Sequence, residues 1–218
     1  MVPAIAIVGE SGSGKTDLVK RLIVEFKKRG KRIAVVKHCH EKIKLNKEGT
    51  DSWLFSEAGS DITVASSSTG IAAIRKVDTD TSIAEILRFI GGSVDLVIFE
   101  GYKKGKIPKI EVHREQTNSD LACPVQVLSA VATDSKMDID IPQLPLNDAS
   151  KIADFIEANL LSVSENDTLL FVNGQQIFIK SFVQDIISEA ILAMIKTLKG
   201  ADDIDNIDIS IKRRSPDA

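Results

Sequence analysis

The amino-acid sequence predicts an α/β fold with a doubly wound, mostly parallel sheet, and three observations support this. Short apolar runs, typical of buried parallel strands, recur through residues 1–161. Segments with apolar residues three and four positions apart, typical of amphipathic helices, alternate with these runs. A glycine-rich loop joins the first apolar run to the first such helix. Alternation of this kind builds a parallel sheet with helices on both faces.

The elements follow from local patterns. Strands are expected at 4–8, 32–37, 62–65, 71–74, 94–99, 109–112 and 125–132. Helices are expected after Gly14, Thr50, Ser82 and Asp148. Ser82 and Glu85 have the spacing of a capping box, in which each side chain bonds the other residue's backbone N–H. The strand–helix–strand order implies parallel pairing through right-handed crossovers.

Residues 162–218 have a different pattern and are expected to form a small ββαβ module beside a nucleotide-binding domain at 1–161. Asn173 and Gly174 suit a two-residue hairpin turn, and Ser181 with Gln184 is a second capping-box pattern. The expected elements are strands at 169–172 and 177–179, a helix ended by Gly200, and a strand at 207–212. A module of about 50 residues needs support from the first domain or a second subunit.

Composition and charge disfavour several classes of protein. With 28 Lys and Arg against 31 Asp and Glu the net charge is −3, and aromatics are 5%, so nucleic-acid binding is not expected. Cys39 and Cys123 stand far apart, which supports neither a disulfide framework nor a zinc ribbon. The first residues show neither a basic n-region nor a cleavable apolar h-region, and no apolar stretch approaches the roughly 18 residues that cross a bilayer, so we expect neither a secretory leader nor a membrane span. We expect a cytoplasmic protein that engages no membrane.

The strongest motif is the glycine loop, which matches GxxxxGK[ST] with a strand before it and a helix after it. Backbone N–H groups of such a loop cradle phosphates, and the helix N-terminus adds positive potential. Lys15 is expected to reach the β- and γ-phosphates and the Thr16 hydroxyl to bind Mg²⁺. The alternative is a Gly- and Ser-rich turn that merely contains Lys-Thr. The candidate nucleotide-binding residues are Gly9, Glu10, Ser11, Gly12, Ser13, Gly14, Lys15 and Thr16.

Two acidic residues stand near the two ends of the strand at 94–99. Glu100 follows its carboxyl end, where ligands of open parallel sheets bind, whereas Asp95 stands roughly 16 Å away at the other end. Glu100 is therefore the expected acid on the Mg²⁺ side, acting through water, and with Lys15 the expected catalytic pair. A solvated Glu at a strand end is the alternative, and Asp95 is expected at the surface.

Cationic residues follow two of the strands. Lys37, His38 and His40 end the second strand on the edge of the glycine loop, so they are expected to face phosphates. Joint metal ligation by His38, Cys39 and His40 is disfavoured, because consecutive side chains alternate in direction. Lys103 begins a lysine-rich lip after Glu100 that suits a second phosphorylated substrate or an acidic partner. Solvated loop residues are the alternative in both places.

Asp134 ends a late strand, where P-loop proteins often read the base of the nucleotide. A carboxylate there can accept hydrogen bonds from guanine N1–H and N2–H. A helix cap or a turn is an equally good interpretation of this residue.

The motifs GESGSGKT, VVKHCH, EGTDSW, DLVIFEGYK and PKIEVHR, in this order, resemble the molybdopterin-guanine dinucleotide biosynthesis protein B (MobB) family over residues 1–160. The resemblance implies a GTP-binding P-loop protein, usually dimeric, that assists the MobA-type transferase joining GMP to molybdopterin. Residues 9–16 would hold GTP and Mg²⁺. The family's other motif positions correspond to His38, His40, Asp51, Glu100, Gly101 and Lys103. Glu41 and Asn46 depart from the family's frequent His and acidic residue.

Three functions fit these observations. The first is an accessory GTPase with slow hydrolysis, since no arginine finger or water-orienting Gln is evident; Arg75 and Arg114 are candidates for the missing group. The second is a small P-loop metabolite kinase, which the absence of an Arg-rich lid disfavours. The third is a nucleotide-loaded adapter that delivers GTP or molybdopterin without hydrolysis.

Overall fold

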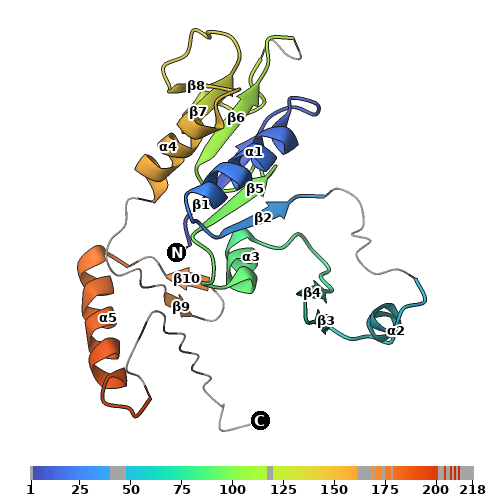
Figure 1. Ribbon diagram of the computed structural model, residues 1–218, viewed down its shortest axis with the longest axis vertical. Coiled ribbons are helices and arrows are strands. Elements are labelled where there is room, and N and C mark those ends of the chain that lie inside the picture. Colours follow the sequence, from blue (N-terminus) through green and yellow to red (C-terminus); the bar gives the residue numbers. More distant parts are fainter. Residues whose placement is uncertain are drawn as a thin grey trace.

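The computed structural model describes residues 2–39, 48–116, 120–161, 168, 170–172, 175–177, 179–200, 204, 207, 209 and 211 (Figure 1). Its helices are α1 (Lys15–Lys28), α2 (Asp51–Glu57), α3 (Ile83–Ile90), α4 (Ala149–Leu160), α5 (Ser181–Ile195) and the short 3₁₀ helix η1 (Val125–Val127). Its strands are β1 (Ala4–Val8), β2 (Ile33–Lys37), β3 (Ile62–Ser67), β4 (Gly70–Arg75), β5 (Leu96–Glu100), β6 (Lys109–His113), β7 (Ala130–Thr133), β8 (Gln143–Pro145), β9 (Leu170–Val172) and β10 (Gln175–Ile177).

Six strands form one sheet in the order β2-β5-β1-β6-β7-β8, and every neighbouring pair is parallel. This confirms the predicted doubly wound α/β fold. β1 lies in the middle, with Ile7 opposite Glu100 of β5 and Ile110 of β6. The carboxyl ends of β1, β5 and β6 therefore meet at one edge of the sheet, which positions the loops that follow them.

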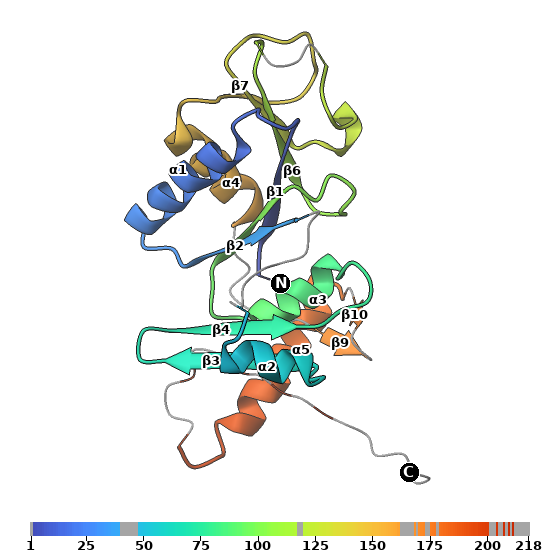
Figure 2. The ribbon, with the colours of Figure 1, turned by 90° about the vertical axis from the view of Figure 1, so that its right-hand side faces the viewer.

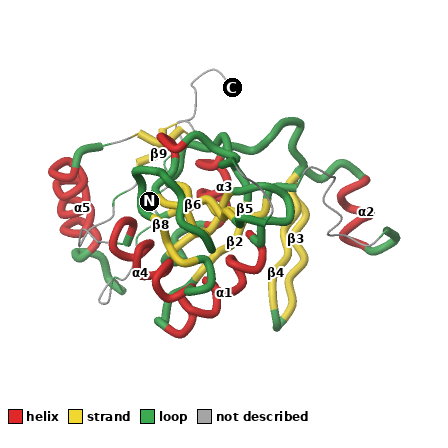
Figure 3. The backbone as a smooth tube through the Cα atoms, turned by 90° about the horizontal axis from the view of Figure 1, so that it is seen from above, coloured by secondary structure: helices red, strands yellow, loops and turns green. Residues whose placement is uncertain are grey.

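Helices cover both faces of the sheet, with α1 and α4 on one side and α3 on the other (Figure 3). On the first face Ile5 and Ile7 of β1 pack with Leu22 of α1 and Ile152 of α4, all fully buried. On the second face Leu87 of α3 joins a smaller core built around apolar residues of β1, β5 and the loops after β6 and β7. Burial of these side chains is the main stabilising contribution.

The strands β3 and β4 pair with each other and not with the sheet, and with α2 they project from it (Figures 1 and 2). The capping box of α3 is confirmed: Ser82 Oγ accepts from the Glu85 N–H, and the Glu85 carboxylate accepts from the Ser82 N–H. Within the described residues no helix is long and apolar enough to cross a membrane.

Several predicted boundaries were wrong. The run at 125–132 divides into η1 and β7, because Pro124 precedes a turn in which Val127 and Leu128 donate back to Pro124 and Val125. The strand β8 was not predicted, since three residues carry too little pattern. The N-cap of α5 is Lys180, one residue before the predicted Ser181. Asn173, Gly174 and most of 201–218 lie outside the described residues.

Candidate functional site

The glycine loop leaves β1 and enters α1 through backbone conformations that favour glycine. Gly9, Gly12 and Gly14 have φ angles of 140°, 79° and 97°. A Cβ on Gly9 would lie 2.6 Å from the carbonyl oxygen of Val112 on β6. The loop therefore packs directly on the neighbouring strand, and Gly9 is required there by space as well as by conformation.

The N-cap of α1 is Gly14 in a left-handed conformation, and no side-chain cap hydrogen bond is made there. The Leu18 N–H donates to the Gly14 carbonyl at 3.0 Å, which begins the regular helix. Backbone N–H groups of the first turn consequently remain for an outside acceptor, and the helix dipole favours an anion. The loop and helix together fit a phosphate group.

Thr16 and Glu100 meet across the sheet edge although 84 positions separate them. The Thr16 hydroxyl donates to Glu100 Oε1 at 2.9 Å, and Lys37 Nζ at the end of β2 lies 3.4 Å from the same oxygen. Mg²⁺ prefers oxygen ligands, and a hydroxyl beside a carboxylate supplies them. These residues therefore fit the cation that the loop motif implies.

Asp95 stands at the other end of β5. Its carboxylate accepts from the Arg32 N–H at 2.6 Å and pairs with the Arg32 guanidinium at 3.2 Å. The backbone hydrogen bond from Arg32 is the main reason why the pKa of Asp95 is lowered. Asp95 thus closes the amino end of the strand, and Glu100 is the acid at the glycine loop.

The Lys15 ammonium group folds onto the loop, where it donates to the Glu10 carbonyl oxygen at 2.6 Å. Partial burial lowers the pKa of Lys15, and the nearby charge of Glu100 opposes this effect. The Glu10 side chain pairs with Lys103 at 2.9 Å, which lowers the pKa of Glu10. Lys103 thereby connects the loop after β5 to the glycine loop.

His38 follows β2 and lies beside the residues after Glu100. Its ring makes an edge contact with Tyr102, with centroids 5.1 Å apart, and the backbone N–H of His38 donates to the Glu100 carbonyl at 3.1 Å. Gly101 has a φ of 94°, and a Cβ there would lie 3.4 Å from the His38 Cβ. The structure therefore brings His38, Gly101 and Lys103 together near Glu100, whereas His40 lies outside the described residues.

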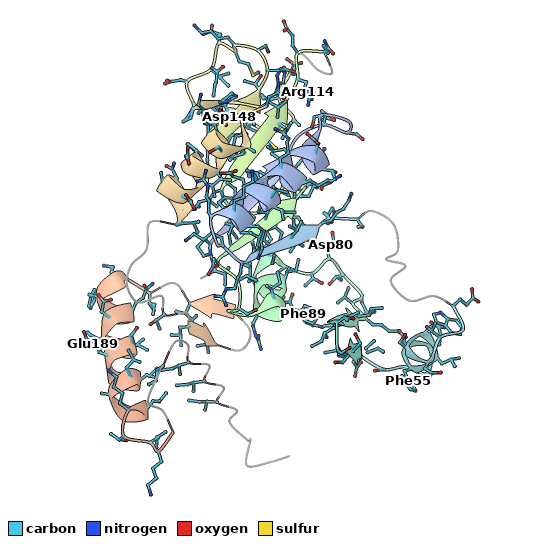
Figure 4. All side chains as sticks on the ribbon, viewed as in Figure 1. Phe55, Asp80, Phe89, Arg114, Asp148 and Glu189 are labelled. Carbon is cyan, nitrogen blue, oxygen red and sulfur yellow. The ribbon has the colours of Figure 1, made fainter. Side chains whose placement is uncertain are left out.

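Arg114 follows β6 and lies at the end of the sheet that carries the glycine loop (Figure 4). Its Nε donates to the Ser13 carbonyl at 3.1 Å, and it pairs with Asp134 at 3.6 Å. The Asp134 carboxylate also accepts from the Glu115 N–H at 3.1 Å. Asp134 thus holds Arg114 against the loop, a contact between distant segments that no local pattern reveals. Its predicted role in reading guanine stays a prediction.

Two other predicted residues are not brought to the glycine loop. Asp51 begins α2, which lies away from the N-terminus of α1 in both Figure 1 and Figure 2. Arg75 ends β4 and pairs with Glu85 at 3.7 Å, so it belongs to the projecting hairpin. Family motifs and charge suggested these residues, but neither shows which strands join the main sheet.

A row of buried polar side chains on β6 was missed by sequence reasoning. Lys109, Glu111 and His113 are 4%, 2% and 6% exposed and share one face of the strand. Lys109 donates to the carbonyls of Gly105 and Ile107, and Glu111 accepts from the N–H groups of Ala122 and Cys123. Alternation of charged and apolar residues is typical of a half-exposed strand, so the loops that cover this face could not be foreseen.

A parallel sheet with a glycine loop between β1 and α1, and an acidic residue ending the adjacent β5, defines a protein of the P-loop NTPase type. Residues 4–134 match the family model of molybdopterin guanine dinucleotide synthesis protein B. The chain belongs to this MobB family.

Known relatives extend the comparison. A molybdopterin-guanine dinucleotide biosynthesis adapter protein of Haemophilus influenzae is 38% identical over 72% of this chain and 88% of its own length. A relative from Methanocaldococcus jannaschii is 28% identical and covers 95% of this chain and 96% of itself. A crystal structure of molybdopterin-guanine biosynthesis protein B is 28% identical, with a TM-score of 0.57 over 72% of this chain and 99% of that chain.

Proposed function

We propose that this protein binds GTP and Mg²⁺ at residues 9–16 and serves as an accessory to the attachment of GMP to molybdopterin. The observation that carries the proposal is the Thr16–Glu100 contact of 2.9 Å beside a glycine loop. Membership of the MobB family supports the biosynthetic role. In this role the partner is a MobA-type transferase, and molybdopterin is a further ligand.

Each part of the loop has a defined task in this proposal. The N–H groups of residues 12–16 cradle the phosphates, and the Ser13 N–H and the Lys15 ammonium exchange the Glu10 carbonyl for phosphate oxygens. Thr16, and Glu100 through water, would hold Mg²⁺, which would supply positive charge beside the β- and γ-phosphates. Lys37, His38 and Lys103 add positive charge beside Glu100.

Hydrolysis is expected to be slow, because a fast GTPase needs an arginine at the γ-phosphate. Arg114 is engaged with the Ser13 carbonyl and with Asp134, so its guanidinium supports the loop. We infer that an additional group, supplied by the transferase or by a second subunit, accelerates turnover. The kinase alternative predicts ATP preference and transfer to a metabolite.

The protein is further proposed to form a homodimer through its projecting part. Val64 and Ile71 on the β3–β4 hairpin are 58% and 76% exposed, and Phe55 on α2 is 62% exposed. Apolar side chains gathered on a projecting hairpin are typical of a protein interface. Sedimentation of the full chain should give a dimer, and Ile71→Lys should shift it toward monomer; a wild-type monomer at all concentrations contradicts this part.

Calorimetric titration of the full chain with GTP and ATP, each with Mg²⁺, tests the proposal. We expect clear GTP preference, loss of binding in Lys15→Ala, and retained binding without turnover in Glu100→Gln. Lys104→Ala, an exposed lysine outside the loop, is the matched control. ATP binding equal to or stronger than GTP binding would overturn the GTP assignment and favour the kinase.

Turnover measured with and without the transferase separates an accessory GTPase from a non-catalytic adapter. If the transferase changes neither the rate of hydrolysis nor GTP affinity, the accessory GTPase is wrong. Cofactor maturation in cells carrying Glu100→Gln then decides whether hydrolysis matters: normal maturation identifies an adapter.

A further inference from the structure

Tyr102, the second residue after β5, has a backbone conformation that an aromatic residue rarely adopts. Its φ is 59°, and it is the one residue other than glycine with a positive φ in the described part of the chain. In the left-handed region the Cβ of such a residue is crowded by the backbone, so the conformation is strained. Strain of this kind persists only where surrounding contacts hold it, and it is commonest at functional sites. The contacts of Tyr102 therefore indicate what the strain serves.

The Tyr102 ring is held by two other rings. It makes an edge contact with the fully buried Phe99 of β5, with centroids 4.9 Å apart, and a second with His38 at 5.1 Å. Edge contacts favour a defined orientation of the rings. Burial raises the pKa of the Tyr102 phenol, and the nearby charge of Asp80 adds to this effect. The ring is thus a fixed point between the residues that follow β2 and those that follow β5.

The backbone on either side of Tyr102 is fixed as well. The Gly101 N–H donates to the Ile7 carbonyl of β1 at 3.0 Å, which ties the chain to the sheet. The Gly105 N–H donates to the Tyr102 carbonyl at 2.9 Å, which closes a turn. The φ angle of Tyr102 is a rotation between these two parts of the chain, so it sets the direction in which the turn leaves the sheet.

Lys103 follows Tyr102 in this turn, and its position depends on that direction. Its Nζ lies 2.9 Å from the Glu10 carboxylate, so the turn reaches back to the glycine loop. With an ordinary negative φ at Tyr102 the turn would leave the sheet in another direction, and the Lys103 ammonium would lose Glu10. The conformation of Tyr102 and the position of Lys103 are therefore coupled.

We propose that Tyr102 is a positioning residue, which acts by holding Lys103 against the glycine loop. The aromatic ring supplies the contacts that keep the strained backbone in place. The inference rests on the proposed function for one step only, which is the contribution of Lys103 to nucleotide binding. The placement of Lys103 by Tyr102 does not depend on which nucleotide binds.

The carboxyl NMR signal of Glu10, followed over pH in the nucleotide-free full chain, tests the placement. Lys103 lowers the pKa of Glu10, so a variant that displaces Lys103 should raise that pKa. We expect Tyr102→Ala to raise the Glu10 pKa as far as Lys103→Ala does, and the double variant to raise it no further. Tyr102→Phe keeps the ring and should leave the pKa unchanged. A general loss of stability would not produce this pattern.

Two further variants complete this test. Phe89→Ala removes an exposed aromatic side chain from α3 and is the matched control, with no change expected in the Glu10 pKa. Tyr102→Gly removes the ring but adopts the positive φ without strain, so it tests the ring even if Tyr102→Ala unfolds. A partial rise of the Glu10 pKa is expected in Tyr102→Gly, because the turn is then no longer held in one direction.

GTP titration of the same variants gives the second readout. Tyr102→Ala should weaken GTP binding about fivefold, the effect of losing one exposed charged contact, and Tyr102→Phe should bind GTP like the wild type. An unchanged Glu10 pKa or an unchanged GTP affinity in Tyr102→Ala would overturn the inference while GTP binding by the wild type stands. If the Glu10 pKa responds as expected but the wild type binds no GTP, the placement of Lys103 stands and the proposed function is wrong.

Discussion

The adjacent central strands β1 and β6 are equally buried, but different interactions hold them. Every side chain of β1 is apolar and inside the two cores. β6 has apolar Ile110 and Val112 on one face and buried polar groups on the other. Packing therefore fixes β1, whereas the loops around β6 are also held by hydrogen bonds that Lys109 donates and that Glu111 accepts. In this sheet the buried polar side chains of β6 thus tie covering loops to the strand, whereas the side chains of β1 hold it by packing alone.

The largest effect is expected where the two strands touch. Gly9→Ala puts a Cβ 2.6 Å from the Val112 carbonyl at a φ of 140°, so the chain must shift or strain. We expect a loss of about 4 kcal/mol in the free energy of unfolding, the sum of backbone strain and overpacking. Urea denaturation measures it. Gly70→Ala, which has open space and no positive φ, should change little; a Gly9→Ala variant as stable as Gly70→Ala would show that the contact is not tight.

The second-largest effect is expected from a change on the polar face of β6. Glu111→Gln keeps the shape but points an amide NH₂ at one of the two backbone N–H groups that the carboxylate accepts. One buried N–H then lacks a partner, which costs about 2 kcal/mol in the free energy of unfolding. Thermal and urea unfolding measure this loss. The exposed Glu57→Gln is the control, and equal stability of the two variants would contradict a structural role for Glu111.

A smaller effect is expected at the support of the glycine loop. Arg114→Ala removes the hydrogen bond to the Ser13 carbonyl and the ion pair with Asp134, at a cost of about 1 kcal/mol. GTP affinity should fall with it, since the loop loses a support. Arg114→Lys should recover only part of the lost stability and GTP affinity, because an ammonium group lacks the forked donor geometry of the guanidinium group. If Arg88→Ala, at an exposed position on α3, weakens GTP binding as much, the support is not specific.

The smallest change concerns the exposed Glu10–Lys103 pair. Lys103 lowers the pKa of Glu10, so Lys103→Ala should raise that pKa toward its ordinary value, as followed by the carboxyl NMR signal. Because the pKa is depressed in the folded state, the pair stabilises the protein above the unfolded-state pKa. That contribution is lost as the pH falls through the folded-state pKa. An unchanged Glu10 titration in Lys103→Ala, with Lys104→Ala as control, would show that the contact is absent in solution.

Local patterns predicted most of the fold, and long-range contacts explain what they missed. The apolar run before Gly9 and the capping box at Ser82 are local, and both have the expected structure. The short β8 carries too few residues for a pattern, and the pairing of β3 with β4 depends on which partners are available.

In the candidate site, too, some contacts could be predicted from the sequence and others depend on long-range packing. The meeting of Thr16 with Glu100 follows from two strands that end at one edge, which the sequence could predict. The contact of Arg114 with Ser13 depends on a side-chain direction across 101 positions, and burial of Glu111 depends on a covering loop. Asp51 was assigned by motif, and α2 lies in the projecting part.

The central position of β1 has a consequence for biosynthesis of the chain. Its residue Ala4 pairs with Val97, 93 positions later, and its other neighbour β6 comes later still. During translation the earliest strand, apolar on both faces, therefore waits without partners until β5 and β6 have left the ribosome. Such a segment is a natural target for chaperones, and ribosome-bound chains that stop before residue 96 should be far more protease-sensitive than chains that extend past residue 161.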